Sequence, residues 1–228
     1  MDYAVPFAGV VTLPVTGSSA AFPVRRIYLV GRNYAAHARE MGHDPDREPP
    51  FFFQKPADAL LSGGADFPYP SRSSDVHHEI EMVVALGAGG TDIPKDKALE
   101  SVFGYAVGID MTRRDLQGEA KKMGRPWEVG KAFEHSAPIT DIVPASAIGH
   151  PAEGRVWLEV NGETRQDGNL NQLIWDVPET IEYLSGLFTL APGDLIFTGT
   201  PAGVAAVARG DRLSGGVEGV GEIRLAVV

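Results

Sequence analysis

Glycine and proline are so frequent in this sequence that few long regular elements can form. The chain of 228 residues contains 27 glycines and 17 prolines, spread along its whole length. Because proline removes a backbone donor and glycine favours turns, these residues divide the chain into short segments. Short apolar runs such as IYLV and FFFQK predict strands, and regular βαβ alternation is absent. We therefore predict an α+β fold with many strands and few short helices.

The predicted elements are separated by turn residues. Asn161-Gly162, after the strand predicted over 156–160, predicts a tight hairpin. Thr112 followed by Asp115 resembles a capping box at the start of a helix, and Asn33 is a candidate cap for a helix that stops at Gly42. Strands are predicted over 24–30, 51–56, 77–86, 102–109, 156–160 and 194–198, and helices over 34–41, 95–101 and 177–187.

The first 23 residues are expected to form an N-terminal arm, and residues 24–228 the main domain. The arm ends in TGSSAAFP, whose small and turn-forming residues predict a hinge. The opening residues lack the basic start of a signal peptide, and Pro6 and Pro14 interrupt their apolar character. No stretch reaches the roughly 18 apolar residues of a membrane helix. We expect a cytoplasmic protein that binds no membrane.

The charge balance is acidic, with 20 Lys and Arg against 30 Asp and Glu and a formal net charge of −10. A surface of this kind disfavours nonspecific binding of nucleic acid or anionic membranes. It still permits a small anionic substrate in a locally positive site. The chain contains no cysteine, which excludes disulfides, thiolate nucleophiles and zinc sites with sulfur ligands.

The segment HHEIEMVV carries two glutamates, Glu79 and Glu81, at strand spacing. Residues two apart on a strand share a face, and this face becomes apolar at Val83 and Ala85. Two carboxylates at such a position resist joint ionisation, and a divalent cation would remove the conflict. The alternative is a pair of glutamates on a solvated strand face. Metal binding is the better explanation of the two.

Asp110 ends the apolar run VFGYAVGI and is the next candidate ligand. Aspartate at a strand-to-helix junction often caps the helix, but Thr112 already offers a capping box with Asp115. Three carboxylates without cysteine are typical of sites for hard ions such as Mg²⁺ or Mn²⁺. We therefore expect Glu79, Glu81 and Asp110 to hold one of these ions.

His37 and Glu40 lie three residues apart on the helix predicted after Gly31, so they share a face. A carboxylate that orients an imidazole makes a general base able to activate water. An incidental pair on an amphipathic surface helix is the alternative, and the spacing alone favours it.

Two lysines have apolar neighbours, which is unusual for plain surface lysines. Lys131 lies in WEVGKAF and Lys55 in FFFQKP. A lysine beside a metal site can stabilise a developing enolate or hold a carboxylate, whereas a snorkelling lysine at a strand end is an equally good explanation. The Gly-rich turn in GDLIFTGTPAGV has backbone N–H groups that could bind a substrate carboxylate.

Seven segments together resemble the fumarylacetoacetate hydrolase superfamily. They are GRNYAAHAREM, PFFFQKP, HHEIE, GIDMTRRDLQ, GKAF, VNGETRQDG and GDLIFTGTPAGV. Each is weak alone, but all seven occur in the family's order across residues 24–228, so the set is specific. The resemblance is closest to acylpyruvate hydrolases, and residues 22–55 resemble the bacterial fumarylpyruvate hydrolases of aromatic degradation.

This resemblance implies a mixed β-roll with few short helices, a homodimer, and a Mg²⁺ or Mn²⁺ cofactor. By motif, Glu79, Glu81 and Asp110 match the family's metal ligands. His37 and Glu40 match a water-activating pair on a lid that orders over bound substrate.

The resemblance also assigns groups around the substrate. Lys131 matches a residue near the metal that stabilises the oxyanion or enolate. The positions that line the family's substrate pocket correspond to Arg32, Lys55, Arg114, Gln117 and Thr200.

The activity implied is divalent-metal-dependent hydrolysis of the carbon–carbon bond of a 3-acylpyruvate. The expected oxo-acid substrate is fumarylpyruvate, which gives fumarate and pyruvate. Decarboxylation of oxaloacetate, or a related isomerisation, is an alternative at the same metal site. The His37–Glu40 pair favours hydrolysis, because decarboxylation needs no attacking water. A metal-binding scaffold without activity is a further alternative, which the joint presence of ligands, pair and lysine disfavours.

Overall fold

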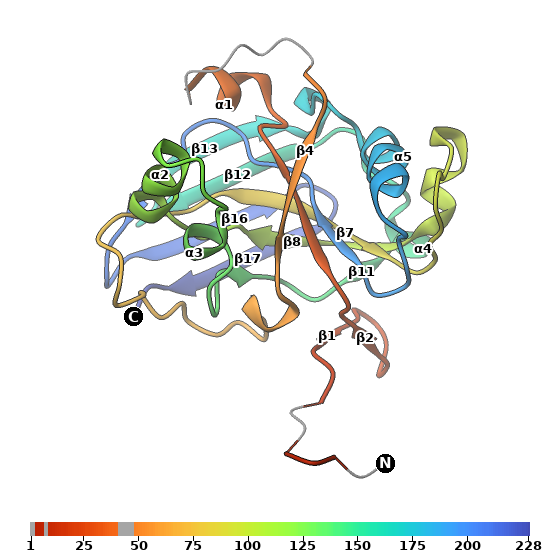
Figure 1. Cartoon of the computed structure of the whole chain (residues 1–228), viewed down its shortest axis with the longest axis horizontal. Coiled ribbons are helices and arrows are strands. Elements are labelled where there is room, and N and C mark those ends of the chain that lie inside the picture. The colour runs from red at the N-terminus through yellow and green to blue at the C-terminus, as the bar shows by residue number, and fades with distance from the viewer. Residues whose placement is uncertain (1–2, 7–8, 41–47) are drawn as a thin grey trace.

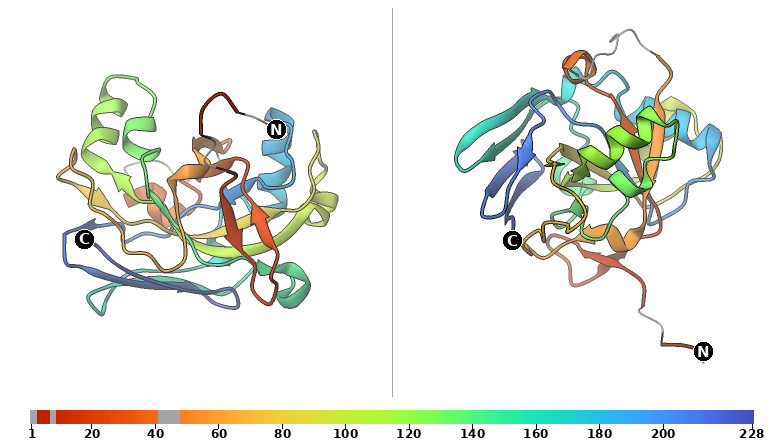
Figure 2. Two further views of the ribbon diagram at one scale, coloured as in Figure 1. Left: turned by 90° about the horizontal axis from the view of Figure 1, so that it is seen from below. Right: turned by 60° about the vertical axis from the view of Figure 1, so that its left-hand side comes forward.

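Two β-sheets lie face to face in the computed structural model, which describes residues 3–6, 9–40 and 48–228 (Figures 1 and 2). The larger sheet contains, in spatial order, β11 (Val143–Pro144), β8 (Val102–Ile109), β7 (Ile80–Leu86), β14 (Leu195–Phe197), β3 (Ile27–Gly31) and β4 (Phe51–Lys55). The smaller sheet contains β13 (Glu163–Asn169), β12 (Arg155–Val160), β16 (Arg212–Val217) and β17 (Gly221–Ala226).

The other elements are short, as the glycine and proline content predicts. The remaining strands are β1 (Thr12–Pro14), β2 (Ala21–Pro23), β5 (Leu60–Leu61), β6 (Val76–His77), β9 (Thr112–Arg113), β10 (Ala137–Pro138) and β15 (Ala206–Val207). The α-helices are α1 (Ala35–Glu40), α2 (Arg114–Lys122), α3 (Glu128–Lys131), α4 (Ala145–Ile148) and α5 (Val177–Leu187), and the 3₁₀ helices are η1 (Ala57–Ala59), η2 (Lys95–Ser101) and η3 (Leu170–Gln172). None of these helices is long and apolar enough to cross a bilayer.

The larger sheet is mixed and has apolar residues on both faces. β14 runs parallel to β3 but antiparallel to β7, which agrees with the predicted α+β class. Ile80 and Met82 of β7 face the smaller sheet, where they join a core that includes Leu158. Val83 and Ala85 belong to a second cluster on the opposite face. Because β7 is buried throughout, the solvated strand face considered for Glu79 and Glu81 does not exist.

The stretch TGSSAAFP is not a hinge. It forms the turn and second strand of an antiparallel hairpin in which β1 pairs with β2. Leu13 and Phe22 point inward from the two strands and belong to the second hydrophobic cluster. The alternation of buried and exposed residues in each strand explains why this segment packs on the sheet.

Several predicted elements are confirmed. The strand over 102–109 and the helix over 177–187 have the predicted bounds, and the helix over 95–101 is a 3₁₀ helix. Asn161 and Gly162 have φ angles of 55° and 81°, as a type I′ hairpin requires. The expected helix end at Gly42 lies outside the described residues.

Two capping predictions are wrong because the side chains have distant partners. Asn33 Nδ2 donates to the carbonyl of Thr198, and its Oδ1 accepts from the backbone of Trp175. Thr112 lies in β9, and α2 begins at Arg114 without a side-chain cap. Asp115 instead accepts hydrogen bonds from the Ser73 hydroxyl and the backbone N–H of Ser74, in the loop before β6.

The predicted strand over 77–86 is interrupted. β6 ends at His77 and β7 begins at Ile80. In the gap, the Gln166 side chain contacts the chain directly: its Oε1 lies 2.9 Å from His78 Nδ1 and accepts from the backbone N–H of Ile80 at 3.1 Å. The break leaves Glu79 immediately ahead of the buried strand.

Candidate active site

Three carboxylates meet at one end of the β7–β8 pair. Glu81 lies opposite Gly108, and Asp110 follows two residues later, so it shares that face. The backbone N–H of Asp110 donates to the carbonyl of Glu79 at 2.8 Å. One oxygen from each of Glu79, Glu81 and Asp110 lies within 4.8 Å of the others, and all three residues are buried. Strand register therefore gathers the three predicted ligands.

Lys131, the last residue of α3, contacts two of these carboxylates. Its Nζ lies 2.8 Å from Glu79 Oε2 and 2.5 Å from Asp110 Oδ2, and it donates to Thr112 Oγ1 at 2.6 Å. Arg114 pairs with the other oxygen of Glu79. Burial alone would raise the pKa of Glu79, but the two cations lower it below its ordinary value. Lys131 is only 2% exposed, so it does not snorkel.

Glu81 has a different environment from its two neighbours. Its Oε2 accepts a hydrogen bond from the backbone N–H of Gly199 at 2.7 Å, and it forms no ion pair within the described parts of the chain. Burial, together with the charges of Asp110 and Glu79, raises the pKa of Glu81 well above its ordinary value. A buried carboxylate without a cation, beside two others, is a donor set that fits a hard divalent ion.

Lys55 does not line the pocket that was expected for it. Its side chain is fully enclosed, and its Nζ lies 3.0 Å from Asp110 Oδ1. It also donates to the carbonyl of Met111 at 3.1 Å and to Ser136 Oγ at 2.9 Å. Burial lowers the pKa of Lys55 to about 8. The sequence indicated an unusual lysine, but the packing places it behind Asp110, where it compensates charge.

Replacing Lys55 by Met is expected to lower the free energy of unfolding by about 3–5 kcal/mol, since it leaves buried polar groups without their cation. Urea unfolding of the metal-free protein measures this loss. Lys97→Met is the matched control, because Lys97 Nζ pairs with Glu100 on the surface, and such pairs contribute about 1 kcal/mol or less. A loss for Lys55→Met as small as that of the control would contradict this role.

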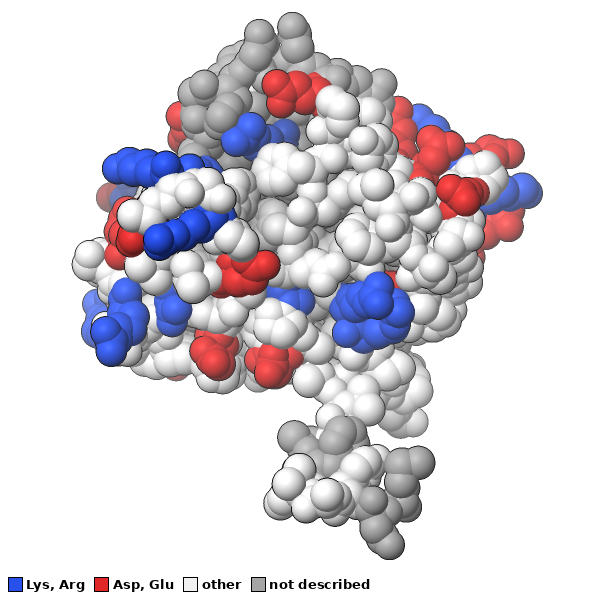
Figure 3. Space-filling view, viewed as in Figure 1, with Lys and Arg blue, Asp and Glu red and all other residues white. Residues whose placement is uncertain are grey.

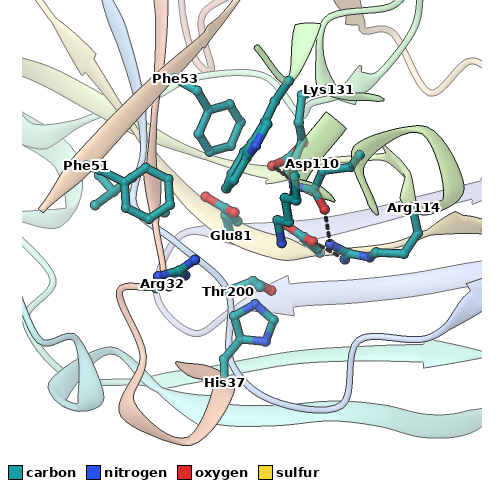
Figure 4. Close-up of a pocket in the computed structure, with 15 residues that line it drawn as sticks. Arg32, His37, Phe51, Phe53, Glu81, Asp110, Arg114, Lys131 and Thr200 are labelled. Atoms are coloured by element: carbon teal, nitrogen blue, oxygen red, sulfur yellow. Dashed lines mark hydrogen bonds and ion pairs between the residues drawn. The ribbon is translucent and has the colours of Figure 1, made fainter. Parts of the chain in front are cut away.

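The His37–Glu40 pair forms on α1. His37 Nδ1 lies 3.2 Å from Glu40 Oε2, and the carboxylate also accepts from the backbone N–H of Gly203 at 3.2 Å. His37 is buried and lines the same pocket as the three carboxylates (Figure 4). The pair is therefore buried at His37 and exposed at Glu40.

The Gly-rich turn donates backbone hydrogen bonds to carboxylates of the same chain. The N–H groups of Gly199 and Gly203 donate to Glu81 and Glu40, so these two donors are used within the chain. Thr200, between them, lines the pocket, and its hydroxyl donates to the carbonyl of Ile80 at 2.7 Å.

Three further expected residues line the pocket together with Thr200. Arg114 Nη1 donates to Gln117 Oε1 at 2.7 Å, which fixes both side chains on the α2 side. Arg32 enters from the other side, beside Phe51 and near His37 (Figure 4).

Sequence and structure comparisons assign the family. The model "Fumarylacetoacetate (FAA) hydrolase C-terminal" matches residues 26–228. This chain belongs to the fumarylacetoacetate hydrolase family. The seven motifs predicted the same membership, and the α+β fold with few helices is confirmed by solved relatives.

Several members of the fumarylacetoacetate hydrolase family are close to this chain. A crystal structure of fumarylpyruvate hydrolase from Pseudomonas aeruginosa, in complex with Mn²⁺ and pyruvate, is 55% identical with a TM-score of 0.97, and covers 100% of this chain and 99% of that one. Fumarylpyruvate hydrolase from Ralstonia sp. is 47% identical over 82% of this chain and 98% of its own. A mitochondrial oxaloacetate tautomerase from Rattus norvegicus is 43% identical over 89% and 91%, respectively.

Part of the pocket is formed by residues that the sequence patterns did not indicate. The additional lining residues are Val30, Gly31, Phe51, Phe53, Lys121 and Trp127. The alternation in FFFQK could have placed Phe51 and Phe53 on one face. Lys121 and Trp127 come from α2 and the loop after it, and no local pattern distinguishes them from surface residues.

Proposed function

We propose that this protein hydrolyses the carbon–carbon bond of a 3-acylpyruvate, with fumarylpyruvate as the first candidate. One observation carries the proposal: a buried cluster of three carboxylates lines the same pocket as His37, whose imidazole contacts Glu40. A base without a metal site, or a metal site without a base, would support hydrolysis less well. The Pseudomonas aeruginosa relative holds Mn²⁺ and pyruvate, and pyruvate is one product of the proposed reaction.

The three carboxylates and the His37–Glu40 pair have different roles in the proposed reaction. A divalent ion held by Glu79, Glu81 and Asp110 would supply Lewis-acid stabilisation of the oxo-acid end. His37 Nδ1 faces Glu40, so Nε2 accepts a proton from water. The hydroxide adds to the distal acyl carbonyl, and the bond between that carbon and C3 of the pyruvate part then breaks.

The electron pair of the broken bond passes to the leaving pyruvate enolate. Lys131, held beside Asp110 and Glu79, stabilises the developing negative charge. The proton that His37 took from water passes to C3 of the enolate, which gives pyruvate, and the acyl part leaves as a carboxylic acid that then ionises.

A second candidate is tautomerisation or decarboxylation of oxaloacetate, since the relative from Rattus norvegicus is an oxaloacetate tautomerase. Both reactions pass through an enolate and need no attacking water, but tautomerisation needs a base to move the proton at C3. The contact between His37 and Glu40 therefore favours hydrolysis over decarboxylation, and the substrate assay separates hydrolysis from tautomerisation.

A substrate panel tests the proposal. Steady-state assays with fumarylpyruvate, maleylpyruvate, acetylpyruvate and oxaloacetate, at one fixed Mg²⁺ concentration, are expected to show pyruvate release fastest from a 3-acylpyruvate. Chelation of the metal is expected to abolish the activity. Turnover of oxaloacetate alone, with no pyruvate from any acylpyruvate, would refute the hydrolase proposal and support the second candidate.

The family resemblance supports further expectations that complete the proposal. These are a homodimer, Mg²⁺ as an alternative to Mn²⁺, a cytoplasmic location, and a catalytic domain over residues 24–228 preceded by an arm over 1–23. Light scattering of the purified chain measures the oligomeric state, and a mass near twice 24.3 kDa is expected.

A further inference from the structure

Two basic side chains at the pocket are not paired with its three carboxylates. Lys55, Arg114 and Lys131 are already paired with them. Arg32 and Lys121 also line or border the pocket, yet neither forms an ion pair with any residue in the described ranges. Arg32 is half-buried and Lys121 is exposed, and the acidic residues whose charges act on them are Glu48 and Glu79, respectively. Figure 3 shows basic side chains gathered over α2 and below α1 on this face.

Arg32 is held toward the pocket by its backbone. Its φ angle of 58° is one that residues other than glycine seldom adopt, and such conformations concentrate at functional sites. The guanidinium carbon lies 5.3 Å from the centre of the Phe51 ring. Gly31 permits this arrangement, because a Cβ there would lie 2.0 Å from Phe51 Cζ.

Lys121 lies on α2 and contacts Trp127, which itself packs against the Phe51 ring that Arg32 contacts. Its Nζ lies 4.9 Å from the centre of the Trp127 ring, and Trp127 meets Phe51 edge-on with ring centres 5.4 Å apart. Partial burial, together with the nearby charges of Arg114 and Arg32, lowers the pKa of Lys121 to about 8. Cation–π contacts hold both cations against the rings, and neither has a carboxylate within ion-pair distance among the described residues.

We propose that Arg32 and Lys121 form a second anion subsite, which binds a carboxylate at the distal end of the acyl group, with Phe51 and Trp127 flanking the chain between the two ends. Flat aromatic walls suit a planar, unsaturated acyl group. Two cations suit a carboxylate. The inference rests on the proposed function and adds a substrate class: acylpyruvates whose acyl group ends in a carboxylate are preferred over those with a neutral acyl group.

The test compares kcat/KM for fumarylpyruvate with kcat/KM for acetylpyruvate, whose acyl group carries no charge. The wild-type protein is expected to prefer fumarylpyruvate by at least about 10-fold, because each charge-assisted hydrogen bond contributes on that order. Arg32→Gln and Lys121→Met are each expected to lower this preference by about 10- to 100-fold. Arg32→Lys retains the charge on the same backbone and is expected to restore most of the preference.

Lys122→Met is the matched control. Lys122 neighbours Lys121 on α2 and is exposed, but it does not line the pocket. It removes one positive charge from the same helix, so it corrects for the change in overall charge and for effects on folding. The preference of this variant is expected to equal that of the wild-type protein.

The outcomes separate the subsite from the function. If the wild-type protein hydrolyses acylpyruvates but Arg32→Gln and Lys121→Met keep its preference, the subsite is refuted and the proposed function stands. If it hydrolyses none, the proposed function fails, and calorimetric titration of the Mg²⁺-loaded protein with fumarate decides the subsite. At least about 10-fold weaker fumarate binding by Arg32→Gln supports the subsite; equal binding, or none by the wild-type protein, overturns it.

Discussion

Replacing His37 by Asn is expected to lower kcat for acylpyruvate hydrolysis by about 10²- to 10⁴-fold, the usual contribution of a general base. Asparagine keeps a polar side chain but has no group that accepts a proton near neutral pH. The metal affinity is expected to stay within about threefold of the wild-type value, because His37 contacts Glu40 and not the three carboxylates. Steady-state kinetics and Mn²⁺ titration measure the two quantities.

His135→Asn is the matched control for this variant. His135 is exposed, and its φ angle of 63° is one that asparagine tolerates well. Its kinetics are expected to equal those of the wild-type protein. Hydrolysis by His37→Asn at the wild-type rate would show that another group activates the water.

Replacing Glu81 by Gln is expected to change activity and stability in opposite directions. Activity should fall by more than the about 10- to 100-fold that follows loss of an outer metal partner, because a direct ligand is removed. Metal-dependent stabilisation, about 2.7 kcal/mol at a metal concentration one hundred times Kd, should disappear. The metal-free variant should nevertheless be at least as stable as the metal-free wild-type protein, since a buried carboxylate without a cation has been neutralised.

The sign of the pH dependence follows from the raised pKa of Glu81. Between the ordinary pKa of a glutamate and this raised value, the folded protein binds more protons than the unfolded chain. The stability of the metal-free wild-type protein should therefore fall as pH rises through this window. Metal affinity should rise over the same window, because the ion displaces the proton.

Glu81→Gln should remove both pH trends at once. Thermal melts at several pH values, with and without Mg²⁺, measure them. Glu119→Gln, at an exposed position of α2, is the control and should keep the wild-type trends. Full metal-dependent stabilisation of Glu81→Gln would contradict the role of Glu81 as a ligand.

The metal cluster could be predicted because it follows from local rules. Glu79 and Glu81 are two residues apart, Asp110 directly follows the next strand, and antiparallel pairing of β7 with β8 brings these positions together. Period-two geometry and the length of the apolar runs contain this information. The helix that carries His37 and Glu40 follows from its pattern in the same way.

The residues that were misplaced depend on partners far away in the chain. Lys55 lies behind Asp110 because Ser136 and Met111 enclose its ammonium group, and no local pattern indicates them. Thr112 accepts from Lys131 instead of capping a helix. The strand break at His78 depends on Gln166, 88 residues later. Such contacts arise from tertiary packing, which overrides local propensity.

The central claim is that Glu79, Glu81 and Asp110 share one divalent ion in a pocket that also admits an oxo acid. Anomalous diffraction from crystals grown with saturating Mn²⁺ and pyruvate tests it most directly. The account predicts one strong manganese peak bonded to an oxygen of each of the three side chains, with pyruvate density adjoining it. An absent peak, with Lys131 still bridging Glu79 and Asp110, would contradict the account.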